Sequence, residues 1–168
     1  MELIIEPPKM VLYVCLGLIL VILASMLLKR GGGRKKILSL MITLVVMTVV
    51  LTLLYRRTTL TVDSRGIQST VYGKITFDWQ EVQEASYIKD FTSSDYGLKT
   101  KLNGVGVPGL QAGRYLLKNG SKARVIVQDQ KDALLFVLPD DLILLAPQEL
   151  EALTAEVEKY ITLRGAGE

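Results

Sequence analysis

The sequence contains no histidine and only one cysteine, Cys15. The absence of histidine removes the commonest general base and the commonest metal ligand, so no Ser-His-Asp or Cys-His site can be built from this chain alone. Cys15 lies within an apolar run, and a single cysteine cannot form an intrachain disulfide. We therefore expect no catalytic site, no metal site and no cofactor.

The chain also lacks a basic stripe of the kind that nucleic-acid binding needs. Its formal net charge is +3, and the positive side chains cluster beside hydrophobic runs rather than along the remaining sequence. A length of 168 residues leaves room for about one globular domain and a small appendage. We expect no nucleic-acid partner.

Two stretches near the N-terminus, 10–28 and 37–55, contain no charged residue and are rich in Leu, Ile and Val. A helix of that length rises roughly 28 Å, enough to cross the hydrocarbon core of a bilayer. Neither stretch has a polar face, which argues against two buried helices of a soluble protein. A cleaved signal peptide is the alternative for the first stretch, but Glu2 and Glu6 precede it and no small-residue cleavage site follows. The sequence predicts an N-terminal tail over 1–9 and a transmembrane hairpin over 10–55.

The loop between these stretches, 29–36, predicts the orientation of the hairpin. It carries five positive side chains, whereas the opposite side offers Lys9, the more distant Arg65, and two arginines next to the second stretch. Because positive loops stay in the cytoplasm, we expect both termini to lie outside it. The charges expected at the membrane interface are Lys29, Arg30, Arg34, Lys35, Lys36, Arg56 and Arg57.

The sequence after 57 changes to short β-rich segments separated by turn residues. Three runs form a meander, and the run 80–89 fits a strand, although a helical turn also fits it. Two hairpins follow, one around Asn119-Gly120 and one around Pro139-Asp140-Asp141. The interval 91–113 is interrupted by glycines and predicts a long polar loop. The expected strands are 58–63, 67–72, 74–79, 80–89, 114–118, 123–129, 133–138 and 142–145.

A C-terminal helix is predicted from Pro147, a favourable first helical residue. Apolar residues recur at helical spacing and form one stripe, which needs a surface to cover. The arrangement that protects the sheet edges is about seven strands in a partly open sandwich or barrel, with the helix capping its open end. We expect this domain over 58–163, followed by a tail over 164–168. The stripe consists of Leu150, Leu153, Val157 and Ile161.

This order of elements resembles the pleckstrin-homology-like fold, and more specifically the bacterial PH domain proteins, in which short transmembrane helices precede such a domain. The resemblance extends over most of 58–163. It rests on the aromatic-x-Trp strand 75–79 with Val82, the glycine-rich run 104–109 leading into 112–115, the turn 118–123, and the apolar strand-Pro-Asp-Asp-strand-Ala-Pro-helix ending. The family pattern leads us to expect Tyr after Pro108-Gly109, but this chain has Leu110.

The resemblance implies a bacterial cell-membrane protein with a binding or assembly role and no conserved active site. The leading hypothesis is therefore a non-enzymatic, membrane-anchored module that presents its β domain to a protein partner, with assembly among membrane proteins or copies of itself left open. The alternative is binding of an anionic lipid or envelope polyanion through the loop 96–114. The candidate residues of that loop are Lys99, Lys101, Gly104, Gly106, Gly109 and Arg114.

Other motifs suggest chemistry but have simpler explanations. Gly104-x-Gly106-x-x-Gly109 spells a dinucleotide fingerprint, but it contains a proline and no helix follows. Asp140 and Asp141 next to Pro139 are expected to form a turn rather than a pair of acid-base groups. Trp79 and Tyr115 are expected to pack in the core or under the cap.

Overall fold

The computed structural model describes residues 1–5, 13, 17, 19–21, 41, 43–46, 48, 58–70 and 74–166. The chain divides into two compact units, Met1–Ile5 with Arg57–Glu168, and Glu6–Arg56. In the second unit the described residues are helical, and most of their large apolar side chains, among them Leu20, Val21 and Met41, are exposed. Within the described part of the chain, no helix is both long and apolar enough to cross a membrane. Most of the predicted spans 10–28 and 37–55, and all of the basic loop 29–36 with Arg56 and Arg57, lie outside the described residues.

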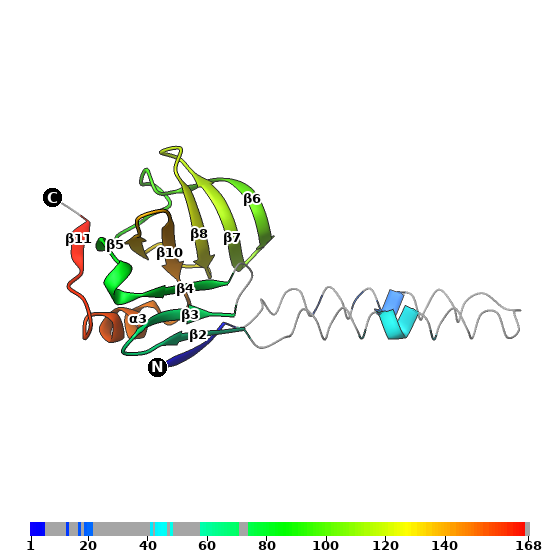
Figure 1. The fold of residues 1–168 in the computed structure, drawn as a ribbon. Helices are drawn as coiled ribbons and strands as arrows, with labels where there is room; N and C mark the ends of the chain where they lie inside the picture. The colour runs from blue at the N-terminus through cyan, green and yellow to red at the C-terminus, as the bar shows by residue number, and fades with distance from the viewer. Residues whose placement is uncertain are drawn as a thin grey trace, which may run out of the picture. The chain divides into compact units, whose positions relative to one another are not determined.

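The first unit contains a four-stranded antiparallel sheet, here called sheet A, shown in Figure 1. The turn between its second and third strands is closed by Asp63, whose carboxylate accepts hydrogen bonds from the amides of Arg65 and Gly66. Strand order in the sheet follows chain order, as in the predicted meander. The strands are β1 (Glu2–Ile5), β2 (Thr58–Val62), β3 (Gly66–Ser69) and β4 (Ile75–Asp78).

Strand β1 corrects the predicted N-terminal tail over 1–9. It pairs antiparallel with β2, and Ile5 lies opposite Thr58. The Met1 ammonium donates a hydrogen bond to the Val62 carbonyl oxygen at 2.6 Å. Leu3 and Ile5 alternate with exposed neighbours and are buried in the core, which is why these residues form a half-buried edge strand.

A second, seven-stranded sheet, here called sheet B, is mixed. All neighbouring strands are antiparallel except β10 with β8 and β11 with β5, which are parallel. A short 3₁₀ helix, η1 (Trp79–Glu81), joins β4 of sheet A to β5 of sheet B. In order across sheet B the strands are β11 (Arg164–Ala166), β5 (Glu84–Ile88), β9 (Ala133–Val137), β10 (Leu142–Ala146), β8 (Lys122–Val127), β7 (Leu110–Leu117) and β6 (Leu98–Val107).

Sheet B buries apolar side chains on both faces. Along β9, Leu134 and Phe136 belong to a core cluster shared with sheet A, whereas Ala133 and Leu135 belong to a second cluster. Since successive strand residues point to opposite faces, the two clusters lie on the two sides of sheet B. This explains the near-continuous apolar sequence of β9 and β10.

Helix α3 (Leu150–Val157) caps the sandwich, as predicted, and packs against β2 of sheet A and β9 of sheet B. Its buried residues are Leu150, Leu153 and Val157. The helix begins three residues later than predicted, because the turn before it is held by the side chain of Gln128, which accepts a hydrogen bond from the Gln148 amide.

Trp79 packs under this cap. Its ring stacks on Tyr160 with centroids 5.6 Å apart, and its indole N–H donates to the Asp63 carbonyl oxygen at 2.9 Å.

Three expectations about strands are corrected. The described residues form eleven strands in two sheets instead of about seven. The segment 164–166, expected in the C-terminal tail, adds β11 beside β5. The predicted loop 91–113 contains all of β6 and the start of β7, for reasons given below.

Candidate functional site

The residues proposed from sequence as a binding loop lie in the β6–β7 hairpin. Lys99, Lys101, Gly104 and Gly106 belong to β6, Arg114 belongs to β7, and Gly109 forms the tight turn between them with a φ of 87°. Most of β6 is exposed, so it lacks the alternating burial that marks a strand in the sequence. Gly104 and Gly106 therefore lie in a paired strand and do not form a flexible loop.

Gly104 and Gly113 show why glycine is required in this hairpin. They lie directly opposite each other and have φ values of 115° and 136°. A Cβ on Gly104 would lie 2.2 Å from the Ala112 carbonyl oxygen, and a Cβ on Gly113 would lie 2.2 Å from that of Asn103. Only residues without a side chain allow the two backbones to approach this closely.

One face of the hairpin is organised around Tyr115. Its hydroxyl donates to the Val105 carbonyl oxygen at 3.0 Å, and burial raises its pKa. A Cβ on Gly106 would meet this hydroxyl at 3.0 Å and the Lys101 Nζ at 3.6 Å. Lys101 therefore extends along the same face as Tyr115, which lies opposite it in the β6–β7 register. Tyr115 is buried, as predicted.

Arg114 lies on the other face of the hairpin, because it is the neighbour of Tyr115 in β7. Across the sheet it faces Arg124 of β8. The Arg124 guanidinium forms an ion pair with Asp141 and donates to the Lys74 carbonyl oxygen at 3.0 Å. The structure thus separates Lys101 from Arg114 rather than gathering the predicted cations into one cluster.

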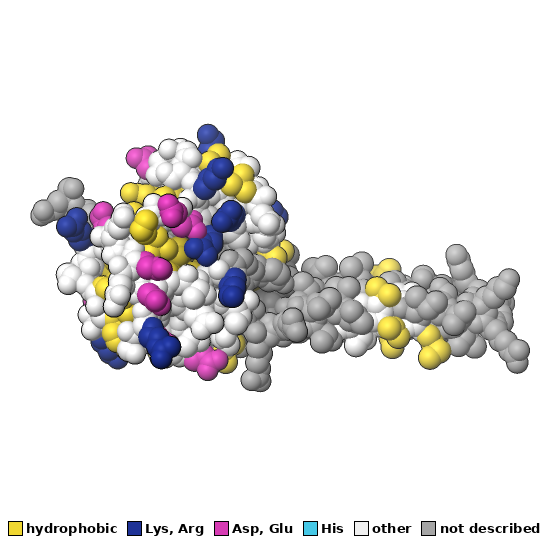
Figure 2. Space-filling model, viewed as in Figure 1, with side chains coloured by type: hydrophobic (Ala, Val, Ile, Leu, Met, Phe, Trp, Pro, Cys, Tyr) yellow, Lys and Arg dark blue, Asp and Glu magenta, His cyan; other side chains and the backbone are white. Residues whose placement is uncertain are grey.

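The region from β6 to β8 nevertheless has one sign of charge. Residues 96–128 include no Asp or Glu, and Figure 2 shows basic side chains predominating over β6 and β7. β6 is also the last strand of its sheet and pairs with no described strand on its outer side. This combination makes the β6 edge the most distinctive exposed feature of the described residues. The six basic residues of the region are Lys99, Lys101, Arg114, Lys118, Lys122 and Arg124.

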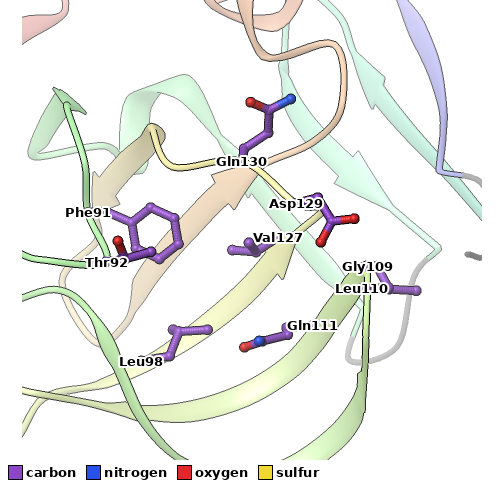
Figure 3. Close-up of a pocket in the computed structure, with 9 residues that line it drawn as sticks. All are labelled: Phe91, Thr92, Leu98, Gly109, Leu110, Gln111, Val127, Asp129 and Gln130. Atoms are coloured by element: carbon purple, nitrogen blue, oxygen red, sulfur yellow. The ribbon is translucent and has the colours of Figure 1, made fainter.

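A cavity of about 330 Å³ lies against sheet B, next to the second apolar cluster. In Figure 3, Phe91, Leu98 and Val127 line its apolar part. Asp129, with a φ of 42°, is the charged residue among its lining. Its volume is at the lower end of the range for small-molecule sites. Its lining comes from strands β6, β7 and β8 and from the loops next to them.

The loop that carries Phe91 is held by a carboxylate network. Asp132 accepts hydrogen bonds from the Tyr87 hydroxyl at 2.7 Å and the Asp90 amide at 2.9 Å. These bonds, the amide first, hold the pKa of Asp132 below its usual value, and the Thr92 and Ser93 hydroxyls do the same for the pKa of Asp90. The hydrogen bond to Asp132 raises the pKa of Tyr87. One wall of the cavity is therefore preorganised.

The other motifs have structural roles. Gly104 and Gly106 lie within a strand and no helix follows Gly109, so the glycine spacing does not form a nucleotide-binding turn. Asp140 and Asp141 lie in the β9–β10 turn, where the Asp141 carboxylate accepts a hydrogen bond from the Leu142 amide in addition to pairing with Arg124.

In a comparison with protein families, a model described as Bacterial PH domain matches residues 57–161. This range is more than half of the chain and runs from the start of β2 to a point just beyond α3, leaving β1 and β11 outside. No curated protein and no solved structure matches the chain.

Proposed function

The chain belongs to the bacterial PH domain family, and from this premise we propose that it is a membrane-anchored, non-enzymatic module that presents its β domain to a protein partner. The membrane anchor consists of the two apolar stretches 10–28 and 37–55. The module acts by binding, because PH-like folds serve as scaffolds for many unrelated partners.

The observation that supports the proposed anchor is the pairing of β1 with β2. Ile5 and Thr58 are neighbours in one sheet, so the segment 6–57 leaves the domain and returns to it at the same place. A segment that starts and ends on one side of a bilayer must cross it an even number of times. Two uncharged stretches of nineteen residues meet this requirement. The exposed apolar side chains on the described helical residues support the same reading, because lipid is the solvent that suits them.

The connections between anchor and domain are short. Only Arg56 and Arg57 separate the second apolar stretch from β2, and two residues reach about 11 Å from Tyr55 to Thr58 when fully extended. The β domain is thereby held at the bilayer surface, where partners confined to the same membrane meet it at raised effective concentration.

The family match leads us to propose the bacterial cell membrane as the location. The charge of the loop 29–36 favours an orientation with the β domain outside the cytoplasm. Protease added to sealed, right-side-out vesicles should then digest the region after Arg57. Digestion only after the vesicles are opened would reverse this orientation while leaving the anchor intact.

Alkaline carbonate washing of membranes that contain the full chain tests the anchor, and cross-linking followed by mild detergent extraction tests the partner. We expect the chain to stay with the membrane and to be recovered in a cross-linked complex. Release of the intact chain by carbonate contradicts the anchor, and recovery as an uncross-linked monomer under several conditions contradicts the partner.

A second candidate function is binding of anionic lipid or an envelope polyanion through 96–114. The absence of acidic residues from 96–128 favours it, but Lys101 and Arg114 lie on opposite faces of their hairpin, so no single headgroup site collects them. Salt-dependent binding of the chain to phosphatidylglycerol vesicles, beyond its insertion, would support this candidate.

A further inference from the structure

The outer edge of β6 is exposed along most of its length. Leu98–Val107 pairs with β7 on one side, and no described strand lies on the other. Every residue from Lys99 to Gly104 is exposed, and Leu102 is 49% exposed despite its apolar character. An unpaired edge of this kind presents a row of backbone N–H and C=O groups that another strand can pair with.

The two halves of β6 differ in how they protect this edge. The pairing with β7 shifts register between Leu98 and Thr100 and again between Lys101 and Asn103. Such bulges, together with exposed lysines, are devices that discourage unselective pairing. From 103 to 107 the register is continuous and the residues are uncharged, so this half can accept a strand.

The positive charge around the β6 edge determines which kind of strand can pair with it. Lys99 and Lys101 form no ion pair within the described residues, and the nearest stretch of sequence, 96–128, supplies no carboxylate. A second copy of this chain, paired through its own β6, would therefore add positive charge and bring no Asp or Glu side chain to neutralise it. A lipid headgroup could neutralise the lysines but could not satisfy the backbone groups of the edge.

We propose that β6 binds an extended acidic segment of a protein partner, which adds a strand along 103–107 and places its carboxylates near Lys99 and Lys101. This is strand addition, in which main-chain hydrogen bonds supply affinity and alternate side chains supply selectivity. The proposal rests on the proposed function, since it names the chemical class of the partner.

The test uses the full chain in nanodiscs of neutral lipid and two end-capped decapeptides, one alternating Thr with Glu and the other alternating Thr with Lys. Fluorescence anisotropy measures affinity, and hydrogen exchange with mass spectrometry locates the bound peptide. The test variant is Lys99→Glu with Lys101→Glu, and the matched control is Lys89→Glu with Lys131→Glu, which changes two exposed lysines outside 96–128 by the same charge.

We expect the Glu peptide to bind and to slow exchange across Leu98–Val107 more than elsewhere. The test variant should weaken that binding by about tenfold and prefer the Lys peptide, because the charge interactions of residues 99 and 101 with the nearby peptide side chains change from attractive to repulsive. The control should keep the original preference.

Protection of a different segment, or an equal loss of affinity in the control, overturns the proposal. So does binding of phosphatidylglycerol vesicles at β6 without binding of the Glu peptide. Each of these results leaves the proposed function standing if the chain resists carbonate extraction and still forms a cross-linked complex.

Discussion

Replacing Ile5 by alanine should destabilise the β domain far more than replacing Ile4 by alanine. Both residues lie in β1, but the Ile5 side chain is 2% exposed and the Ile4 side chain is 56% exposed. The two substitutions remove the same atoms and alter strand propensity in the same way. Their difference therefore isolates the burial of β1 in the core.

The expected magnitude follows from the burial of Ile5 in the core cluster shared by the two sheets. Truncating a buried isoleucine to alanine costs about 2–5 kcal/mol, because transfer energy is lost and a cavity remains. The same change at an exposed site costs about 0.5 kcal/mol or less beyond strand propensity. The free energies of unfolding of the two variants should thus differ by at least about 1.5 kcal/mol, more than tenfold in the folded-to-unfolded ratio.

Pulse proteolysis of the full chain in detergent micelles across a urea series measures this difference. With a urea dependence of about 1–3 kcal/mol per molar, the midpoint of Ile5→Ala should fall below that of Ile4→Ala by roughly 0.5–2 M. Equal midpoints for the two variants would refute the pairing of β1 with β2. The N-terminal residues would then be the free tail that the sequence alone suggested.

Two further predictions concern sheet B and the wall of its cavity. Gly113→Ala should lower the free energy of unfolding much more than Gly120→Ala does in the same urea assay. A Cβ at Gly113 would meet the Asn103 carbonyl oxygen, whereas a Cβ at Gly120, with a φ of 86°, would meet nothing within 4 Å. Equal losses of stability in the two variants would contradict the close approach of β6 and β7. Asp132 has a lowered pKa in the fold, so its ionised form stabilises the protein above its ordinary pKa of 3.8, and this contribution is lost as pH falls through the folded value. Asp132→Asn should therefore flatten the decline of stability below about pH 4, as measured by acid unfolding monitored through tyrosine fluorescence, and an unchanged slope would contradict the network.

Much of the β domain could be predicted because its strands carry local signals. The hairpin around Asn119-Gly120 follows from residues that tolerate positive φ, and Gly120 has that conformation. The helical spacing of Leu150, Leu153, Val157 and Ile161 predicted the capping helix. The first three are buried in α3, whereas Ile161 lies beyond the end of the helix and is partly buried. The PH-like character of the domain is confirmed by the family match.

The features that sequence analysis missed lack such signals. β6 is an exposed edge strand, so neither alternation nor hydrophobicity marks it, and its glycines resemble those of a loop. β11 has three residues and pairs in parallel with a strand far from it in sequence. The interval 96–114 was therefore predicted with the wrong backbone, as a loop instead of a strand pair. The exposed edge proposed as a binding site depends on which strands do not pair, and short-range sequence patterns do not show that.

Strand β1 connects the fold to the proposed membrane anchor in a way that the family match alone does not. It lies outside the matched range, yet its buried residues complete a sheet whose other strands all follow the apolar segment. If the segment 6–57 crossed the bilayer an odd number of times, β1 would lie on the far side and could not pair with β2. The edge of β2 would then be bare, and the core would lose Leu3 and Ile5. With the proposed anchor, completion of the β domain requires an even number of crossings, so we expect faulty insertion of either apolar stretch to appear also as a destabilised domain.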